Sequence, residues 1–176
     1  DNWGESKKIA PIAIRVHKSQ HQLITSHEIQ DQPVVPLAMV SEWCLRIATA
    51  FYPKAYIAEV SDLKVLKGIQ LKTFAGIGDW LDVVCEEIGA DHLNMMVKNP
   101  DGTPYYQMSI SLTKTEAASE PYVQEEKSLP PWKLATDRIY KDLLFHGKDL
   151  QVVKKLLGSS DTDCMGLLQM PDEFDL

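Results

Sequence analysis

His27 lies nine residues before Pro36, and the polar loop between them leads into a long apolar segment. An imidazole changes charge near neutral pH, so it can take up or release a proton. A proline suits the first position of a helix, and the N–H groups of a first helical turn have no partner inside the helix. An imidazole beside such a helix start predicts a site for proton chemistry on an acyl group.

The segment Leu37–Phe51 predicts the helix that positions this loop. Its apolar surface is interrupted only at Ser41, Glu42, Arg46 and Thr49. A helix that is apolar on nearly all sides is expected to be surrounded by other structure. Glu42 and Arg46 are four positions apart, so they could also form an ion pair on the helix surface.

Apolar alternation before and after this helix predicts an antiparallel sheet wrapped around it. The turn signal Asn-Pro-Asp-Gly at residues 99–102 joins two of the strands as a hairpin. The helix and the sheet together predict an α+β unit over residues 1–114. The expected strands are Ile9–Val16, Ala55–Leu66, Ile69–Phe74, Trp80–Ile88, His92–Val97 and Tyr105–Leu112.

The sequence changes character after residue 114. Residues 115–133 are rich in glutamate and proline and lack apolar periodicity, which predicts a surface linker. Residues 134–176 are too short to form a core of their own, so we expect an incomplete second unit. The chain starts with Asp1 rather than Met, which suggests a piece of a longer polypeptide. The elements expected after the linker are a helix, Ala135–Phe145, two strands, Leu150–Leu157 and Met165–Met170, and an acidic tail, Pro171–Leu176.

The composition excludes several classes of protein. Hydrophobic residues make up 44% of the sequence and charged residues 24%, as is usual for globular domains. The net charge is −7 and the basic residues are scattered, so the sequence does not predict a groove that binds nucleic acid. No apolar run reaches the roughly 18 residues of a membrane span, and no signal-peptide pattern is present. Cys44, Cys85 and Cys164 form no CxxC pair, which indicates a reducing, cytoplasmic compartment and argues against zinc. His17 and His21 lack an evident third ligand, so no metal site is expected.

Two segments, His27–Pro36 and Ile139–Gln151, resemble motifs of one protein family. The first is similar to the HxxxGxxxxP signature of hot-dog-fold dehydratases that act on 3-hydroxyacyl chains carried by acyl carrier protein, and the following LAMVSEW resembles the start of their central helix. The second resembles the LFHGpxFQ segment of dehydratase domains in polyketide synthases and polyunsaturated fatty acid synthases, where it opens the second of two fused hot dogs. The resemblance implies an α+β hot-dog fold followed by the start of a second hot dog.

The resemblance also implies the roles of individual residues. His27 would be the base that takes the α-proton of the acyl thioester. Glu42 lies six residues after Pro36, where single-hot-dog dehydratases carry the acidic partner that is supplied across a dimer. His146, in the second motif, is expected to be structural. The thioester would be held by the loop and the first helical turn, at Asp31, Val35, Pro36 and Leu37.

The chain departs from the family pattern at several positions. Asp31 replaces the glycine of the first motif, Leu37 replaces a glycine that usually follows the proline, and Ser26 stands where many members have aspartate. A side chain at Asp31 would hinder the close approach of backbone to ligand and add negative charge near the developing oxyanion. In double hot dogs the acid is the aspartate of a DxxxQ or DxxxH motif, and residues 147–176 contain neither.

The leading hypothesis is a dehydratase domain that removes water from a 3-hydroxyacyl chain on acyl carrier protein and leaves a trans-2-enoyl thioester, in polyketide or polyunsaturated fatty acid biosynthesis. The substrate would arrive on phosphopantetheine, and no metal or nucleotide cofactor is expected. The expected partners are acyl carrier protein, other synthase domains and a second copy of the chain. An alternative is a non-catalytic hot-dog domain that shapes the synthase or docks acyl carrier protein, and a third is a thioesterase, which the His-to-Pro spacing disfavours.

Overall fold

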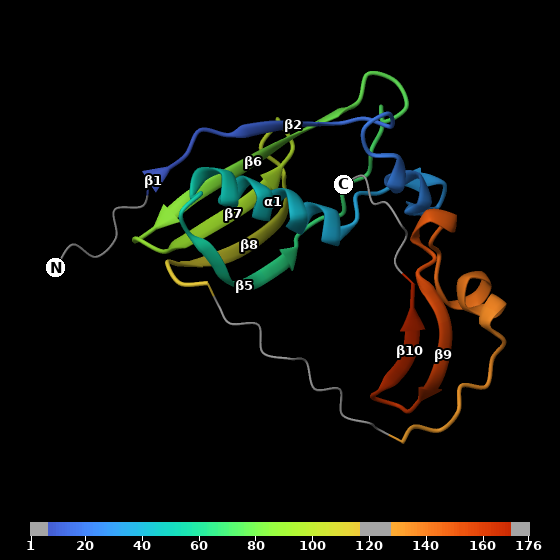
Figure 1. Cartoon of the computed structure of the whole chain (residues 1–176). Coiled ribbons are helices and arrows are strands. Elements are labelled where there is room, and N and C mark those ends of the chain that lie inside the picture. The colour runs from blue at the N-terminus through green and yellow to red at the C-terminus, as the bar shows by residue number, and fades with distance from the viewer. Residues whose placement is uncertain (1–6, 117–127, 170–176) are drawn as a thin grey trace.

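The first part of the chain folds as an antiparallel sheet packed around one helix (Figure 1). The computed structural model describes residues 7–116 and 128–169. The strand order is β1-β6-β7-β8-β5, and β2 also pairs with β6. This arrangement confirms the expected α+β architecture. The strands are β1 (Lys7–Lys8), β2 (Ile12–Val16), β5 (Tyr56–Val65), β6 (Asp79–Ile88), β7 (His92–Lys98) and β8 (Pro104–Thr113).

Helix α1 (Leu37–Phe51) has the bounds expected from the sequence. Its buried side chains, Met39, Val40, Trp43, Cys44 and Ala48, form one stripe. They pack on the inner face of the sheet, where alternate residues of β6, β7 and β8 are buried because successive strand side chains point to opposite faces. The opposite side of the helix is partly exposed, so the expectation that other structure surrounds it on all sides is wrong for the described part of this chain.

Strand β5 forms one edge of the sheet and pairs only with β8 among the described strands. Several of its apolar side chains are exposed, namely Tyr56, Val60, Leu63 and Val65. A long edge strand with exposed apolar side chains is suited to pairing with a further strand.

The expected strand Ile69–Phe74 is wrong. This segment contributes a single bridge, between Gln70 and Val34, although Ile69, Leu71 and Phe74 are buried. The apolar alternation of this segment arises because its apolar side chains pack under the start of α1, not because the segment is a strand of the sheet. The first expected strand begins later than predicted, at Ile12, after a proline that cannot donate to a strand ladder.

The second part is less regular than the sequence suggests. In place of the helix Ala135–Phe145, the chain forms a 3-10 turn, η2 (Thr136–Arg138), and one π-helical turn, η3 (Ile139–Leu143). Ile139 is the only apolar side chain fully buried among described residues 128–169, so little packing supports a regular helix here. The strands are shifted by a few residues and pair as a separate hairpin. The remaining elements are η4 (Lys148–Leu150), β9 (Val153–Ser159) and β10 (Cys164–Leu168).

Residues 117–127 of the expected linker and the acidic tail lie outside the described residues. The end of the expected linker is described, and there Pro131 forms a bridge with Gly158 of β9. The boundaries at residues 114 and 134 therefore stay predictions. Within the described residues, no helix is long and apolar enough to cross a bilayer.

Candidate functional site

His27 lies between a 3-10 turn, η1 (Gln22–Ser26), and a small hairpin made of β3 (Glu28–Ile29) and β4 (Gln32–Pro33). Its Nδ1 lies 2.8 Å from the carbonyl oxygen of Val34. A carbonyl can only accept a hydrogen bond, so this contact places the ring proton on Nδ1. The Nε2 lone pair of the neutral ring is then available, as a general base requires.

The segment that orients His27 is tied to the core. The Val34 N–H donates to the His27 carbonyl at 3.0 Å, and the Val35 N–H donates to Ile69 at 3.0 Å. The hydroxyl of Tyr106, which is buried on β8, lies 3.4 Å from the Val35 carbonyl. The ring orientation of His27 therefore depends on the backbone that leads into α1, not on a free surface loop.

The start of α1 offers unpartnered N–H groups near this loop. Pro36 precedes the helix with an extended backbone and no N–H of its own, and no side chain caps the helix. Within the described residues, the N–H groups of Leu37 and Ala38 donate no hydrogen bond, and Ala38 is exposed. The positive end of the helix dipole adds to their ability to stabilise an oxyanion.

Asp31 occupies the turn of the small hairpin with a φ of 60°, next to Gln30 with a φ of 54°. Two successive left-handed residues are typical of the type I′ turn that joins hairpin strands, and aspartate is among the residues that tolerate this conformation. The backbone shape for which the motif uses glycine is therefore present. The Asp31 side chain is exposed.

Glu42 is not brought to His27 within the described chain. Its Oε1 accepts a hydrogen bond from Arg46 Nε at 2.7 Å, and the side chains of Glu42 and Arg46 are 36% and 59% exposed. This is the helical ion pair that the sequence also allowed. A catalytic role for Glu42 stays a prediction, and it would need this carboxylate to approach a His27 of another copy.

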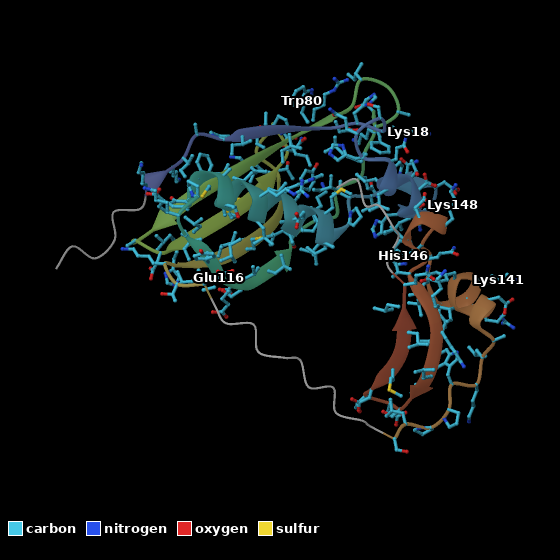
Figure 2. The ribbon with its side chains drawn as sticks, in the orientation of Figure 1. Lys18, Trp80, Glu116, Lys141, His146 and Lys148 are labelled. Carbon is cyan, nitrogen blue, oxygen red and sulfur yellow. The ribbon has the colours of Figure 1, made fainter. Side chains whose placement is uncertain are left out.

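The second sequence motif packs directly on the first. The ring centroid of Phe145 lies 5.0 Å from that of His27 in an edge-on arrangement, and the ring of His146 lies 5.5 Å from His27. Phe145 and His146 are stacked on each other at 4.5 Å. Figure 2 shows His146 where the second part of the chain meets the His27 region. The sequence placed these residues in a separate, structural unit, and the fold brings them to the candidate base.

A set of hydrogen bonds between residues 26 and 147–149 holds this contact. The Gly147 N–H donates to the Ser26 carbonyl at 2.8 Å, and the Ser26 hydroxyl donates to Asp149 Oδ2 at 2.8 Å. Ser26 is only 4% exposed and is the one buried polar residue of the described chain. Sequence reasoning treated Ser26 as a departure from the motif and did not identify Asp149. The occurrence of both motifs in one chain was the signal that could have linked them.

Other reactive side chains lie away from this site. Burial raises the pKa of the Cys44 thiol to about 12 and that of Cys85 to about 11, so neither is a thiolate nucleophile at neutral pH. His21 packs edge-on against Trp43, and His17 lies 2.9 Å from the Gly76 carbonyl. Within the described ranges, no group of three histidine, cysteine, aspartate or glutamate residues is placed to hold a metal.

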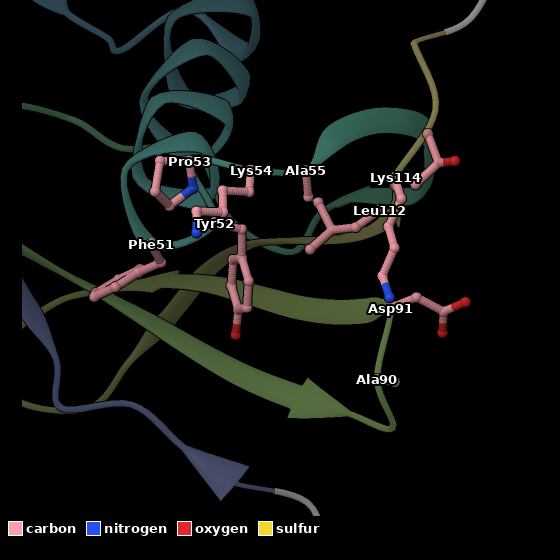
Figure 3. A pocket seen from close by; sticks show the side chains of 10 residues that line it. Phe51, Tyr52, Pro53, Lys54, Ala55, Ala90, Asp91, Leu112 and Lys114 are labelled. Carbon is pink, nitrogen blue, oxygen red and sulfur yellow. The ribbon is translucent and has the colours of Figure 1, made fainter.

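A cavity of about 620 Å³ lies at the opposite end of α1 from Pro36 (Figure 3). Phe51, Tyr52 and Leu112 form part of its wall, and Lys114 stands at its rim. Desolvation raises the pKa of Tyr52, and the hydrogen bond between its hydroxyl and Glu87 raises it further. No residue of the His27 site lines this cavity.

No protein-family model and no curated protein matches the sequence. The solved structures that are similar to the chain over 96% of its length include the following three. The dehydratase domain from the CurF module of the curacin polyketide synthase has a TM-score of 0.73 at 15% identity, with 65% of that chain covered. The dehydratase domain of a mycocerosic acid synthase-like polyketide synthase has a TM-score of 0.72 at 13% identity, with 62% covered. An isomerase-inactive variant of GphF DH1 has a TM-score of 0.66 at 15% identity, with 58% covered.

The chain thus spans about three fifths of the length of these structures. Identities this low show a shared fold, and the hot-dog fold implied by the resemblance is confirmed at that level. Whether the second part belongs to a second hot dog stays a prediction.

Proposed function

We propose that the chain is a dehydratase domain that converts a 3-hydroxyacyl thioester to a trans-2-enoyl thioester. The observation that carries this proposal is the hydrogen bond from His27 Nδ1 to the Val34 carbonyl, beside the first turn of α1. It leaves Nε2 as a base, and the segment that accepts this hydrogen bond leads directly into the uncapped start of α1. The fold shared with polyketide synthase dehydratase domains supports the same class of reaction.

In this reaction His27 Nε2 takes the α-proton of the thioester. Negative charge then develops on the thioester oxygen, and the N–H groups of Leu37 and Ala38 stabilise it. Asp31, Val35 and the helix start would shape the position of the thioester. The electron pair of the broken C–H bond forms the new double bond, and the C–O bond breaks as the 3-hydroxyl takes a proton from a general acid and leaves as water. The resemblance gives this acid role to Glu42 of a second copy. No step of this scheme requires a metal or a nucleotide.

The proposed substrate is an acyl chain carried on the phosphopantetheine of acyl carrier protein, within a polyketide or polyunsaturated fatty acid synthase. The support is the similarity to domains of polyketide synthases. Other domains of the synthase are the further proposed partners. We propose a cytoplasmic location, which agrees with three cysteines that are all free.

We also propose that the chain forms a homodimer. The support is the exposed apolar edge strand β5 and the uncovered side of α1. Val60→Lys would place a charge on this edge strand and should shift the chain to monomer in analytical ultracentrifugation, whereas Ile77→Lys, at an exposed apolar residue in the loop before β6, should leave the dimer unchanged. A wild-type chain that is monomeric at all concentrations would contradict the dimer.

The function is tested with 3-hydroxybutyryl-pantetheine, by following the enoyl thioester through its ultraviolet absorbance and mass. We expect turnover by the wild-type chain and by His92→Ala, whose exposed ring is hydrogen-bonded to Asp91. His27→Ala should abolish turnover with the fold intact. Turnover that survives His27→Ala would refute the proposal.

The alternative, a non-catalytic hot-dog domain, is favoured by one observation. Within the described residues, no carboxylate contacts His27, because Glu42 pairs with Arg46 and Asp149 pairs with Ser26. A wild-type chain that binds acyl carrier protein and forms no enoyl product would establish this alternative. Release of free acid would instead indicate a thioesterase.

A further inference from the structure

The loop before β6 presents two large apolar side chains to solvent. Ile77 in this loop is 74% exposed, the highest value among the large apolar side chains of the described residues, and Trp80, the second residue of β6, is 50% exposed. Trp80 lies opposite Arg15 of β2 in the sheet register, so their side chains share one face. Leu81 is buried, which places Trp80 and Arg15 on the outer face.

Hydrogen bonds fix the backbone of this loop. The N–H groups of Gly76 and Gly78 both donate to the Thr73 carbonyl at 2.9 Å. The Asp79 carboxylate accepts from the N–H groups of Lys72 and Thr73 at 3.0 and 2.9 Å. A segment that is already ordered loses little conformational entropy when a partner binds it.

The loop is also held against β2 and the turn that follows β2. Arg15 Nε donates to the Ile77 carbonyl at 2.8 Å, and the Lys18 N–H donates to the Phe74 carbonyl at 3.0 Å. Gly78 has a φ of 82°, and a Cβ added there would lie 3.0 Å from Arg15 Nε. The fold therefore holds Ile77 in solvent on a tightly packed loop. Exposed apolar side chains with a polar rim are typical of protein interaction sites.

Basic side chains surround Ile77 and Trp80. Residues 15–18 and 72–80 contain three Lys or Arg residues and one acidic residue, although the whole chain has a net charge of −7. The acidic residue, Asp79, is only partly exposed and both of its carboxylate oxygens accept backbone hydrogen bonds. Figure 2 shows Lys18 and Trp80 beside the loop. The apolar pair and its exposed basic neighbours, together called the β2–β6 surface, are Arg15, Lys18, Lys72, Ile77 and Trp80.

The β2–β6 surface lies at the end of the sheet where His27 is found. The segment that enters the loop is joined to the segment that orients His27, because Gln70 forms a bridge with Val34 and the Leu71 N–H donates to the Pro33 carbonyl at 2.9 Å. Figure 1 shows the loop before β6 and η1, which directly precedes His27, at this same end. A partner bound to the β2–β6 surface would therefore be close to the candidate base.

We propose that the β2–β6 surface docks an acidic face of the acyl carrier protein that delivers the thioester to His27. This inference rests on the dehydratase function proposed above. Ile77 and Trp80 bury apolar area against the carrier, and the basic side chains around them pair with its carboxylates. Charge pairs at the rim of an interface accelerate association, and salt weakens them. The surface contacts the carrier protein itself, so docking does not require the phosphopantetheine arm.

The first test compares two forms of one substrate. 3-Hydroxybutyryl-pantetheine needs no docking, whereas the same acyl group loaded on an acidic acyl carrier protein does. The double variant Lys18→Glu/Lys72→Glu should raise the KM for the carrier-bound substrate about tenfold, with kcat and turnover of the pantetheine substrate unchanged. Ile77→Ser should raise the same KM. The matched controls are Lys54→Glu, at an exposed residue beyond the far end of α1, and Ile88→Ser, at the far end of β6.

The second test measures docking without turnover, by calorimetric titration with the same carrier protein carrying no acyl group. The carrier should bind the wild-type chain with or without its phosphopantetheine arm, and both the double variant and added salt should weaken binding. Binding that requires the arm, or equal affinities of the double variant and Lys54→Glu, would overturn the inference. If neither substrate is turned over, the proposed function fails. The titration then decides separately whether the β2–β6 surface docks the carrier of a non-catalytic domain.

Discussion

Gly147 lies directly against Ser26, across the two parts of the chain. Its N–H donates to the Ser26 carbonyl at 2.8 Å, and a Cβ added at residue 147 would come within 2.8 Å of the Ser26 Cα. Only glycine permits this approach without a shift of backbone. The contact determines how Phe145 and His146 reach His27, and it therefore links the second sequence motif to the candidate site.

Replacement of Gly147 should loosen this contact. Gly147→Ala introduces a methyl group where Ser26 leaves no space, and such overpacking typically costs about 1–3 kcal/mol. We expect a lower midpoint of urea unfolding and faster amide exchange at Ser26 and Gly147. Gly68→Ala is the control, because nothing lies within 4 Å of a Cβ at that position. Equal effects of the two substitutions would contradict the close contact.

The hydrogen bond between Ser26 and Asp149 should contribute measurably to docking of the second part. A hydrogen bond to a charged group is worth about 1.5–3 kcal/mol when buried, and exposure of Asp149 lowers this to about 1 kcal/mol. A double-mutant cycle of Ser26→Ala and Asp149→Ala in urea unfolding should give a coupling of that size. Strict additivity of the two changes would argue against the bond.

The positive φ of Asp31 should determine which side chains can replace it without loss of stability. Asp31→Gly is expected to leave the fold unchanged, because glycine adopts the left-handed conformation without steric cost. Asp31→Val should destabilise the chain by about 1–2 kcal/mol, since a β-branched side chain clashes there. Thermal unfolding of both variants tests this order. If Asp31 also weakens catalysis through its charge, Asp31→Gly will raise the rate of enoyl formation.

Glu42→Gln tests the acid that the resemblance implies. Because Glu42 is paired with Arg46 on the helix surface, we expect Glu42→Gln to change the free energy of unfolding by only about 0.3–0.5 kcal/mol, and to leave enoyl formation nearly unchanged unless a second copy presents Glu42 to His27. The measurement is the turnover rate of the dimer. A rate loss of about 10²-fold would instead support Glu42 as the general acid.

Mild acid should destabilise the fold through His21 and His146. Burial lowers the pKa of both imidazoles below the ordinary value of 6.5, and His27 lowers that of His146 further. The unfolded chain then binds protons that the folded chain does not, so stability is complete above this value and falls as the pH drops below it. Urea unfolding one pH unit above and one pH unit below 6.5 should show a lower free energy of unfolding at the lower pH.

His21→Gln should reduce this pH dependence, and Gly68→Ala, which changes no titratable group, should leave it unchanged. A flat stability profile across the same interval in the wild-type chain would contradict the lowered pKa values.

Local pattern was sufficient for the regular elements, whereas the candidate base followed from the resemblance of His27–Pro36 to a family motif. The apolar run of α1 predicts its bounds, Leu37–Phe51, and alternation predicts β6, β7 and β8 to within one residue. These signals are local because helix and strand periodicity depend on neighbouring side chains. The apolar alternation of Ile69–Phe74 wrongly predicted a strand, because burial under a helix start and burial in a sheet favour the same apolar residues.

Only the tertiary structure decided what surrounds His27. Ser26 and Asp149 are 123 positions apart, and no periodicity in either segment indicates that they meet. The same holds for His146, which the sequence assigned a structural role and the fold places 5.5 Å from His27. The motif resemblance along the chain indicated which residue could act as a base. The close approach at Gly147, which depends on backbone packing between distant segments, determined which residues are its neighbours.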